Sequence, residues 1–469
     1  MGAVEPSNAP SAGDSPTPST SGTASTGGPV GAGTTSSGGP TGSSPSGAGG
    51  ATFSSPPPAL VPAGAPTAMV GESSDSTATK GTPPTTPATP PATVPTGTTQ
   101  PGAQLTAGTW DDNLNFDFYL GYLSNTAASQ LQGLPLIDRS ARMSILVKTA
   151  DGQPVAGAQV GVVDSAGHSF SSITGAEGRV LFFPGLSGVA AGAPVTITAV
   201  AAEGTASQAS NATAGTVELS LTTTTRSAVT GLDLAFVIDT TGSMGDELSY
   251  VQTELDNIVS GIAAQFPNVA QHWALVVYRD TGDLYVVRSF DFSSDLASFR
   301  QTLAAQASDG GNDTPEAVDQ GLAAATQLSW RGGAVARLAF WIADAPHHVG
   351  RETAVVSALA AATAKGVHLY PVAASGIDDL GEYTMRTAAE VTGGRYLFLT
   401  NDSGIGGDHQ EPHIPCYYVT TLASAMQRMV ATEVTGTYVA PAAAEILRTG
   451  GDPQSQQCTL TDGRVVTAW

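Results

Sequence analysis

The stretch that decides the fold lies near the middle of the chain, where residues 234–243 read Leu-Ala-Phe-Val-Ile-Asp-Thr-Thr-Gly-Ser. Its first half, residues 234–238, is a continuous apolar run of the kind found in parallel strands that are buried on both faces. Further on, Leu248, Val251 and Leu255 have the spacing of one face of an amphipathic helix. A buried strand followed by such a helix is the repeating unit of an α/β domain.

The same alternation continues as far as residue 436. Strands are expected at residues 273–278, 338–342, 367–372 and 396–399, with a short edge strand at 284–287. Helices are expected at 295–306, 315–329, 352–365, 378–391 and 421–434. We therefore predict that residues 230–436 form an α/β domain with a doubly wound, mostly parallel sheet.

Four further segments flank this domain. Residues 1–108 are rich in Ser, Thr, Gly, Pro and Ala, which predicts a disordered stalk. Residues 109–142 form a lead-in with one predicted helix, and residues 437–469 form a C-terminal extension. Residues 143–222 contain short β-rich runs separated by turns, which predicts a small antiparallel β-sandwich. The run at 151–158 resembles the immunoglobulin-like or prealbumin-like modules of bacterial surface proteins.

Polar residues gather directly after the predicted strands, and in an open α/β sheet ligands bind beyond the carboxyl ends of the strands. These candidates are Asp239, Thr241 and Ser243 after the first strand, Asp280 and Asp283 after the second, Asp313 and Glu316 before the 315–329 helix, and Asp344, His347 and His348 after the strand at 338–342. The carboxylates and hydroxyls among them are oxygen ligands, which suit Mg²⁺, Mn²⁺ or Ca²⁺ better than zinc.

The five residues from Asp239 to Ser243 match the D-x-[ST]-x-S signature and resemble the metal-ion-dependent adhesion site of von Willebrand factor type A domains. The resemblance covers about residues 230–436. It implies that Asp239, Thr241 and Ser243 form the first metal loop and that Asp344 belongs to the third.

The second loop of that family usually supplies a Thr, whereas Asp313 stands in that place here. The loop is similar to the Asp-Ser-Pro-Glu loop of integrin β-subunit domains, which makes Glu316 a further candidate ligand. For Asp280 and Asp283 two interpretations stay open, an adjacent metal site or a simple turn. His347 and His348 either line the rim of the site or have a structural role.

A rival cluster is formed by His409, Glu411 and His413, which would share one face of a strand. Two His and one Glu are a catalytic zinc set, and they would indicate a metal-dependent hydrolase. Pro412 excludes the helix on which His-Glu-x-x-His metalloproteases carry their ligands. The other interpretation of this segment is a polar loop.

The chain has two cysteines, Cys416 and Cys458, so a disulfide scaffold and a four-cysteine zinc site are excluded. The two either pair or remain reduced thiols. We expect a disulfide, because no third cysteine competes and the architecture resembles that of exported proteins.

The chain carries 18 Lys and Arg against 40 Asp and Glu, a net charge of −22, which argues against nucleic acid as a partner. The sequence contains no run of 18 or more apolar residues, so it predicts no transmembrane helix. Residues 1–6 show no basic region and no apolar run, so either the protein is cytoplasmic or its export signal is missing from this sequence. We expect an extracellular or cell-surface location, with a lipid anchor on the missing leader as one route.

Together these features predict a divalent-cation-dependent protein-binding or adhesion module on a bacterial cell surface. The metal, Mg²⁺ in the first place, would coordinate a carboxylate of a protein partner. A search for a nucleophile elbow or a phosphate-binding loop finds neither, so we expect no enzymatic activity. The alternatives are a metal-dependent hydrolase and an intracellular metal-dependent assembly scaffold.

Overall fold

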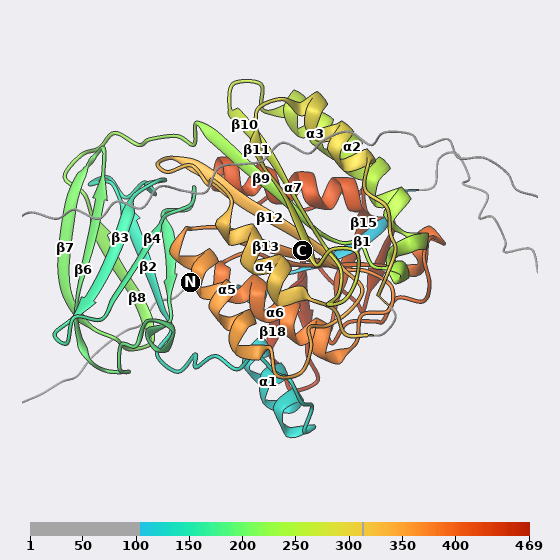
Figure 1. Cartoon of the computed structure of the whole chain (residues 1–469). Coiled ribbons are helices and arrows are strands. Elements are labelled where there is room, and N and C mark those ends of the chain that lie inside the picture. The colour runs from blue at the N-terminus through green and yellow to red at the C-terminus, as the bar shows by residue number, and fades with distance from the viewer. Residues whose placement is uncertain (1–103, 312–313) are drawn as a thin grey trace, which may run out of the picture. The chain divides into compact units, whose positions relative to one another are not determined.

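The computed structural model describes residues 104–311 and 314–469. Most of the stalk predicted for residues 1–108, and the candidate ligand Asp313, lie outside the described residues. The described residues form an α/β domain, a β-sandwich that precedes it in sequence, and a C-terminal extension (Figure 1).

A nine-stranded sheet forms the centre of the α/β domain, in the order β11-β10-β9-β12-β13-β14-β1-β15-β16. Its strands are β1 (Thr106–Trp110), β9 (Gly231–Asp239), β10 (Ala270–Tyr278), β11 (Val287–Ser293), β12 (Val335–Ala343), β13 (His368–Ala373), β14 (Tyr396–Leu399), β15 (Tyr417–Thr421) and β16 (Arg448–Gly450). The five strands from β10 to β14 in this order run parallel. The predicted doubly wound, mostly parallel sheet is confirmed.

Helices cover both faces of this sheet because the residues of its central strands alternate between two hydrophobic cores. Leu234, Phe236 and Ile238 pack in the core that contains α2, α3 and α7, whereas Ala235 and Val237 pack in the core that contains α4, α5 and α6. Figure 1 shows these two layers. The helices are α1 (Phe116–Ala128), α2 (Leu248–Gln265), α3 (Leu296–Ala304), α4 (Val318–Gln327), α5 (Glu352–Ala364), α6 (Asp379–Thr392) and α7 (Leu422–Thr435).

The edge strand differs from the prediction. It was expected at residues 284–287, but β11 begins at Val287 and pairs with β10 in the antiparallel direction. Leu284, which suggested the strand, lies in the preceding turn with 81% of its surface exposed. An apolar residue in a turn was therefore mistaken for part of the strand.

The segment before α1 contributes a strand to the main sheet that the sequence did not predict. β1 lies between β14 and β15 and pairs with both in the antiparallel direction. The boundary predicted at residue 108 runs through this strand. Gly108 is one reason why the sequence does not predict this strand. A Cβ at this position would lie 2.2 Å from the ring of Phe398. A small residue is required at this position, and small residues indicate strands poorly.

Two sheets make up the β-sandwich, in the orders β5-β2-β8 and β4-β3-β6-β7. Their strands are β2 (Met143–Lys148), β3 (Gln159–Asp164), β4 (Ser169–Ile173), β5 (Arg179–Phe182), β6 (Pro194–Ala201), β7 (Gly204–Asn211) and β8 (Gly215–Ser220). Residues of both sheets share one hydrophobic core. The expected antiparallel pairing holds except between β2 and β8, which run parallel.

The C-terminal extension adds β16 to the main sheet and then forms a hairpin of β17 (Gln457–Thr459) and β18 (Val465–Thr467). A disulfide joins Cys416 to Cys458, with Cα atoms 6.5 Å apart, which confirms the expected pair. Three short 3₁₀ helices complete the structure: η1 (Pro184–Ser187), η2 (Gly242–Asp246) and η3 (Asn401–Ser403). Among the described residues, none of the helices has the length and apolar character needed to cross a membrane.

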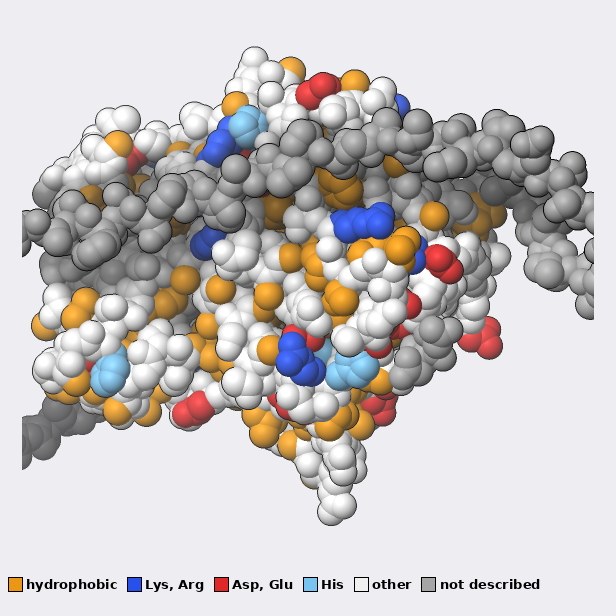
Figure 2. Space-filling model, viewed as in Figure 1, with side chains coloured by type: hydrophobic (Ala, Val, Ile, Leu, Met, Phe, Trp, Pro, Cys, Tyr) orange, Lys and Arg blue, Asp and Glu red, His pale blue; other side chains and the backbone are white. Residues whose placement is uncertain are grey.

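Charged side chains are spread over the face of the molecule drawn in Figure 2. There the described Lys and Arg side chains lie singly or in small groups among neutral and apolar ones. The described part of this face therefore presents no continuous basic surface of the kind that follows a nucleic-acid backbone.

Candidate metal centre

The candidate residues come together at the carboxyl ends of β9, β10 and β12. Asp239 is the last residue of β9 and pairs in register with Tyr278, the last residue of β10. Asp344 follows the end of β12. Glu316 reaches the same edge because its backbone N–H donates to the carbonyl of Pro346 at 2.9 Å, in the loop after Asp344.

The first loop is held in shape by its own side chains. Asp239 Oδ1 accepts hydrogen bonds from the backbone N–H of Thr241 at 2.9 Å and from its hydroxyl at 2.7 Å. The Thr241 hydroxyl lies 3.2 Å from Ser243 Oγ. Asp239 and Thr241 are fully buried, whereas Ser243 is exposed. The three predicted residues of this loop are therefore brought together, and one of their oxygens faces solvent.

Among the described residues, Asp239 Oδ2 and Glu316 Oε2 are buried carboxylate oxygens at this edge that have no hydrogen-bond partner. The backbone of Gly311 passes close to both residues' loops. A Cβ on Gly311 would lie 2.6 Å from Thr241 Cβ and 2.7 Å from Glu316 Oε1. A buried carboxylate oxygen without a donor is unfavourable, so these two atoms call for a donor or a cation that the described residues do not supply.

The pKa values of Asp239 and Glu316 are raised by burial and by repulsion from neighbouring acids. Burial, with a further contribution from Asp344, raises the pKa of Asp239 to about 7. Burial also raises the pKa of Glu316, to about 9, and the charges of Asp239, Asp280, Asp344 and Asp283 add to this shift. The acids repel one another, and a cation among them would favour their ionised forms.

Tyr278 is a neighbour of the site that the sequence did not indicate. Its backbone pairs in register with Asp239, and its hydroxyl accepts a hydrogen bond from Trp341 Nε1 at 3.0 Å. Tyr278 continues the apolar pattern of a buried strand and ends it, so the sequence gave no reason to separate this residue from the core.

The donor set fits a hard divalent cation better than zinc. Among the described residues, no three His, Cys, Asp or Glu side chains are close enough together to hold a metal ion. A site of the predicted kind needs fewer carboxylates, because hydroxyls, waters and a partner's carboxylate provide the other oxygens. Asp239, Thr241 and Ser243, with one further carboxylate from Glu316 or Asp344, could hold such an ion, and Asp313 lies outside the described residues.

Asp280 and Asp283 connect the loops around the cluster. Asp280 Oδ1 lies 2.6 Å from His348 Nε2. Asp283 Oδ2 accepts hydrogen bonds from the backbone N–H of Asp280 at 3.1 Å and of Gly311 at 3.0 Å. Asp283 thus joins the second strand end to the loop that carries Glu316, and His348 lies at the rim through its contact with Asp280.

His347 has a structural environment. Its ring is fully buried, with Nε2 2.9 Å from the carbonyl of Gly133 and Nδ1 3.3 Å from the hydroxyl of Thr384. Burial lowers the pKa of His347. Of the two interpretations left open by the sequence, the structure therefore favours the structural one, in which His347 joins the third loop to the lead-in segment.

The rival cluster is dispersed over separate partners. His409 lies 3.0 Å from Glu247 Oε1, and His413 lies 2.9 Å from Glu382 Oε2. The carboxylate of Glu411 accepts a hydrogen bond from the hydroxyl of Tyr417. The structure does not bring the three side chains together, because each is held by a different partner.

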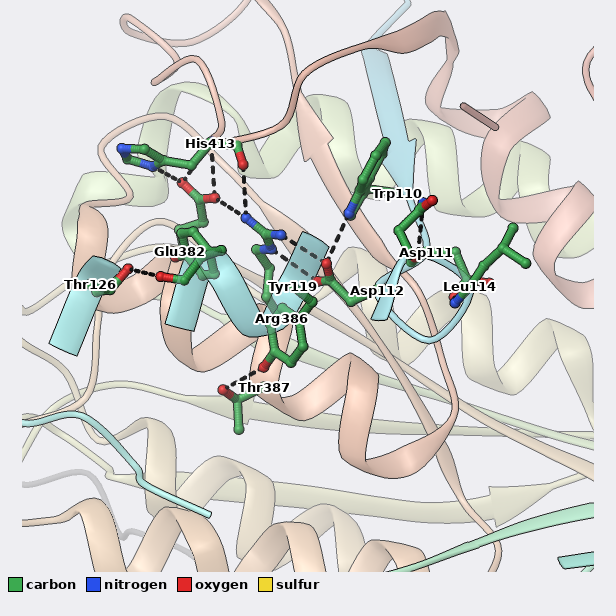
Figure 3. A network of polar contacts seen from close by, with 12 residues as sticks. Trp110, Asp111, Asp112, Leu114, Tyr119, Thr126, Glu382, Arg386, Thr387 and His413 are labelled. Atoms are coloured by element: carbon green, nitrogen blue, oxygen red, sulfur yellow. Dashed lines mark hydrogen bonds and ion pairs between the residues drawn. The ribbon is translucent and has the colours of Figure 1, made fainter. Parts of the chain in front are cut away.

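A buried ionic network was also not evident from the sequence. Figure 3 shows Arg386 of α6 between the carboxylates of Asp112 and Glu382, at 2.8 and 2.9 Å. Its guanidinium also lies 3.8 Å from the centre of the Tyr122 ring. The only signal in the sequence was an Arg in the helix predicted at 378–391. Since Asp112 and Tyr122 precede the sandwich, this network fastens the lead-in segment to the α/β domain.

A comparison with models of protein families agrees with this geometry. The model of the von Willebrand factor A domain family matches residues 233–375, so this part of the chain is a von Willebrand factor A domain. Such domains mediate interactions between proteins, and the chain therefore carries a protein-interaction module.

The relatives cover limited parts of the molecule. The ariadne-like RING finger protein R811 of Acanthamoeba polyphaga mimivirus is 39% identical over 122 residues, which are 25% of this chain and 11% of that protein. The chain thus spans about a tenth of the length of this relative.

Two solved structures are also similar. One is the conserved hypothetical protein BatB from Bacteroides thetaiotaomicron, with a TM-score of 0.31, 15% identity, and coverage of 43% of this chain and 98% of that chain. The other is an aerotolerance-related membrane protein from Bacteroides fragilis, with a TM-score of 0.30, 15% identity, and coverage of 44% and 100%.

Proposed function

We propose that the von Willebrand factor A domain binds a protein partner through a divalent cation, in the first place Mg²⁺, with Mn²⁺ or Ca²⁺ as substitutes. Asp239, Thr241 and Ser243 would hold the ion, together with Glu316 and Asp344. The observation that carries this proposal is a pair of buried carboxylate oxygens, Asp239 Oδ2 and Glu316 Oε2, that have no partner among the described residues and lie at the strand ends that also carry the hydroxyls of Thr241 and Ser243.

The residues of the first loop are suited to present a bound ion to solvent. The Thr241 hydroxyl donates to Asp239 Oδ1, whereas Oδ2 has no hydrogen-bond partner among the described residues and is available to an ion. Ser243 is exposed, so the ion would be reached from that side. The bound cation would supply positive charge and an open coordination position for an outside carboxylate.

The charge of the chain supports a cation-mediated contact with an acidic partner. With a net charge of −22, the protein would repel an acidic partner. A cation at the strand ends gives a local attraction that the protein's own side chains do not. The proposed location is extracellular or at a cell surface, and the Cys416–Cys458 disulfide supports an oxidising compartment.

Calorimetric titration of the full chain with Mn²⁺ and Mg²⁺ tests the proposal. D239N keeps the size of the side chain but removes its charge, and we expect it to weaken binding by roughly 10–100-fold or more. D256N removes one charge from the exposed side chain of Asp256 on α2 and serves as the matched control. Equal affinity of D239N and wild type, or an equal loss in D256N, would contradict the assignment.

A further inference from the structure

A second buried carboxylate lies just beyond the first metal loop. Glu247 follows η2, which begins directly after Thr241, and its side chain is 1% exposed. Oε1 and Oε2 accept hydrogen bonds from the backbone N–H of Ser375 at 3.2 and 3.4 Å, and Oε1 lies 3.0 Å from His409 Nε2. Ser375 lies just after the end of β13, so Glu247 joins the first loop to a strand end two strands away from β9 in the sheet.

His409 connects Glu247 to the end of the next strand in the sheet, β14. Its Nδ1 lies 2.9 Å from Oδ1 of Asn401, the first residue of η3 after β14. The same Oδ1 accepts a hydrogen bond from the backbone N–H of His409 at 3.0 Å. A backbone N–H can only donate, so this amide atom is the oxygen, and the Nδ1 that faces it must carry a proton.

A proton must also lie between His409 Nε2 and Glu247 Oε1. Either an imidazolium faces a carboxylate, or a neutral ring faces a protonated carboxyl group. In both cases the pair is neutral as a whole. Glu247 can therefore fix the loop without offering a charged ligand that would compete for the cation.

The surrounding backbone is shaped around this pair. Gly406 has a φ of +81°, and a Cβ there would lie 2.2 Å from Glu247 Oε1. Only a residue without a side chain lets the loop between β14 and β15 close over the carboxylate. The contact is thus specified by Glu247, His409, Asn401 and Gly406 together.

We propose that Glu247 is a positioning residue for the first metal loop and acts through its buried pair with His409. This inference rests on the proposed function, since it concerns the same metal site. It assigns the loop that contains His409 a role in keeping Thr241 and Ser243 in the arrangement that binds the ion.

The chain offers a matched control at the other end of β13. Glu433 of α7 and His368, the first residue of β13, form a second, partly buried pair at 2.7 Å. The amino end of a parallel strand lies at the opposite edge of the sheet from the metal loops. Removing Glu433 should therefore lower stability without changing the metal site.

The test is Mn²⁺ titration by calorimetry on the full chain, with thermal unfolding in chelator recorded for each variant. We expect E247A to weaken Mn²⁺ binding by roughly 10–100-fold, and E433A to keep the wild-type affinity although its melting temperature falls. E247Q should recover most of the affinity, because its amide can accept from Ser375 and donate to a neutral Nε2. H409A should also weaken binding, and the double variant E247A/H409A should be no worse than E247A.

The outcomes separate this inference from the proposed function. Wild-type affinity in both E247A and H409A, or an equal loss in E433A, would overturn the positioning role alone. If E247A does not unfold cooperatively, E247Q and H409A carry the test. Absence of Mn²⁺ binding by the wild type would overturn the proposed function, and this inference with it.

Discussion

Arg386 is a residue whose side chain is fully buried and balanced by two equally buried carboxylates. Desolvation alone would make such a cation unstable, but the charges of Asp112 and Glu382 raise its pKa well above the usual value. The arrangement is favourable only while all partners are present. Replacing Arg386 alone should therefore destabilise the protein more than replacing Arg386, Asp112 and Glu382 together.

We predict that R386M lowers the free energy of unfolding by roughly 3–5 kcal/mol, because it leaves Asp112 buried without its counter-charge and Glu382 with only the part-exposed His413 as a partner. The triple variant D112N/E382Q/R386M should recover much of this loss. Urea unfolding followed by circular dichroism measures both. R300M, which breaks the exposed pair with Asp256, should leave the midpoint nearly unchanged. A loss as small for R386M as for R300M would contradict the argument.

His413 gives the same region a dependence on pH. The hydrogen bond with Glu382 raises the pKa of His413 above its ordinary 6.5, although its side chain is 54% exposed. The folded state therefore binds this proton more tightly than the unfolded state. The resulting stability is fully present below about pH 6.5 and is lost as the pH rises through the folded value.

The corresponding prediction compares wild type with H413Q. The stability difference between them should be larger at about pH 6 than at about pH 8, and its size should be modest because of the exposure. Urea midpoints at the two pH values provide the measurement. A stability difference between wild type and H413Q that grows with pH would contradict the prediction.

At the scale of elements, β1 depends on one glycine. A Cβ at Gly108 would lie 2.2, 2.5 and 3.0 Å from three carbon atoms of the Phe398 ring. We expect G108A to lower the free energy of unfolding by about 1–3 kcal/mol, because the ring must shift in a packed core. G121A in α1 is the control, since a Cβ there meets no atom within 4 Å. Thermal unfolding of both variants separates the steric clash at Gly108 from the effect of adding a methyl group where there is space for it.

The same elements show what the sequence could predict. Most strands and helices of the α/β domain followed from apolar runs and helical spacing, but β15 and β16 were not predicted and the edge strand begins at Val287 instead of residue 284. Asp239 and Asp344 were singled out by their positions after strands. β1 was missed because Gly108 and its small neighbours are required by the Phe398 ring. The sequence does not show which residues far apart in the chain come into contact in the folded protein.

Loop residues illustrate that limit. His347 contacts Gly133, which is 214 residues away, and His409 contacts Glu247, which is 162 residues away. The spacing of His409, Glu411 and His413 suggested one shared metal, because alternation in a strand would bring them to one face. The segment is a loop, so each side chain turns to a different partner.

At the scale of the whole molecule, the Cys416–Cys458 disulfide holds the C-terminal extension against the main sheet. The two cysteines are 42 residues apart in sequence. Chain entropy for a loop of this length gives about 4 kcal/mol of stabilisation. The same extension reaches the lead-in segment, because the backbone N–H of Thr467 donates to Asn115 Oδ1 at 2.8 Å.

We therefore predict that C416S/C458S lowers the free energy of unfolding by about 4 kcal/mol. Reduction of the wild type should give the same stability as the double variant, and the double variant should not respond to reductant. Denaturant unfolding with and without reductant makes the comparison. Equal stability of oxidised and reduced wild type would contradict the prediction.

The position of β1 also has a consequence for biosynthesis. Thr106 forms its side-chain hydrogen bonds with Thr400, 294 residues further along the chain. The neighbour on its other side, β15, is made later still. During translation β1 leaves the ribosome long before either partner exists, so the main sheet closes only after β15 has been made. A nascent chain that stalls between β14 and β15 would leave one edge of β1 unpaired, which gives the cell a reason to protect β1 until β15 has been made.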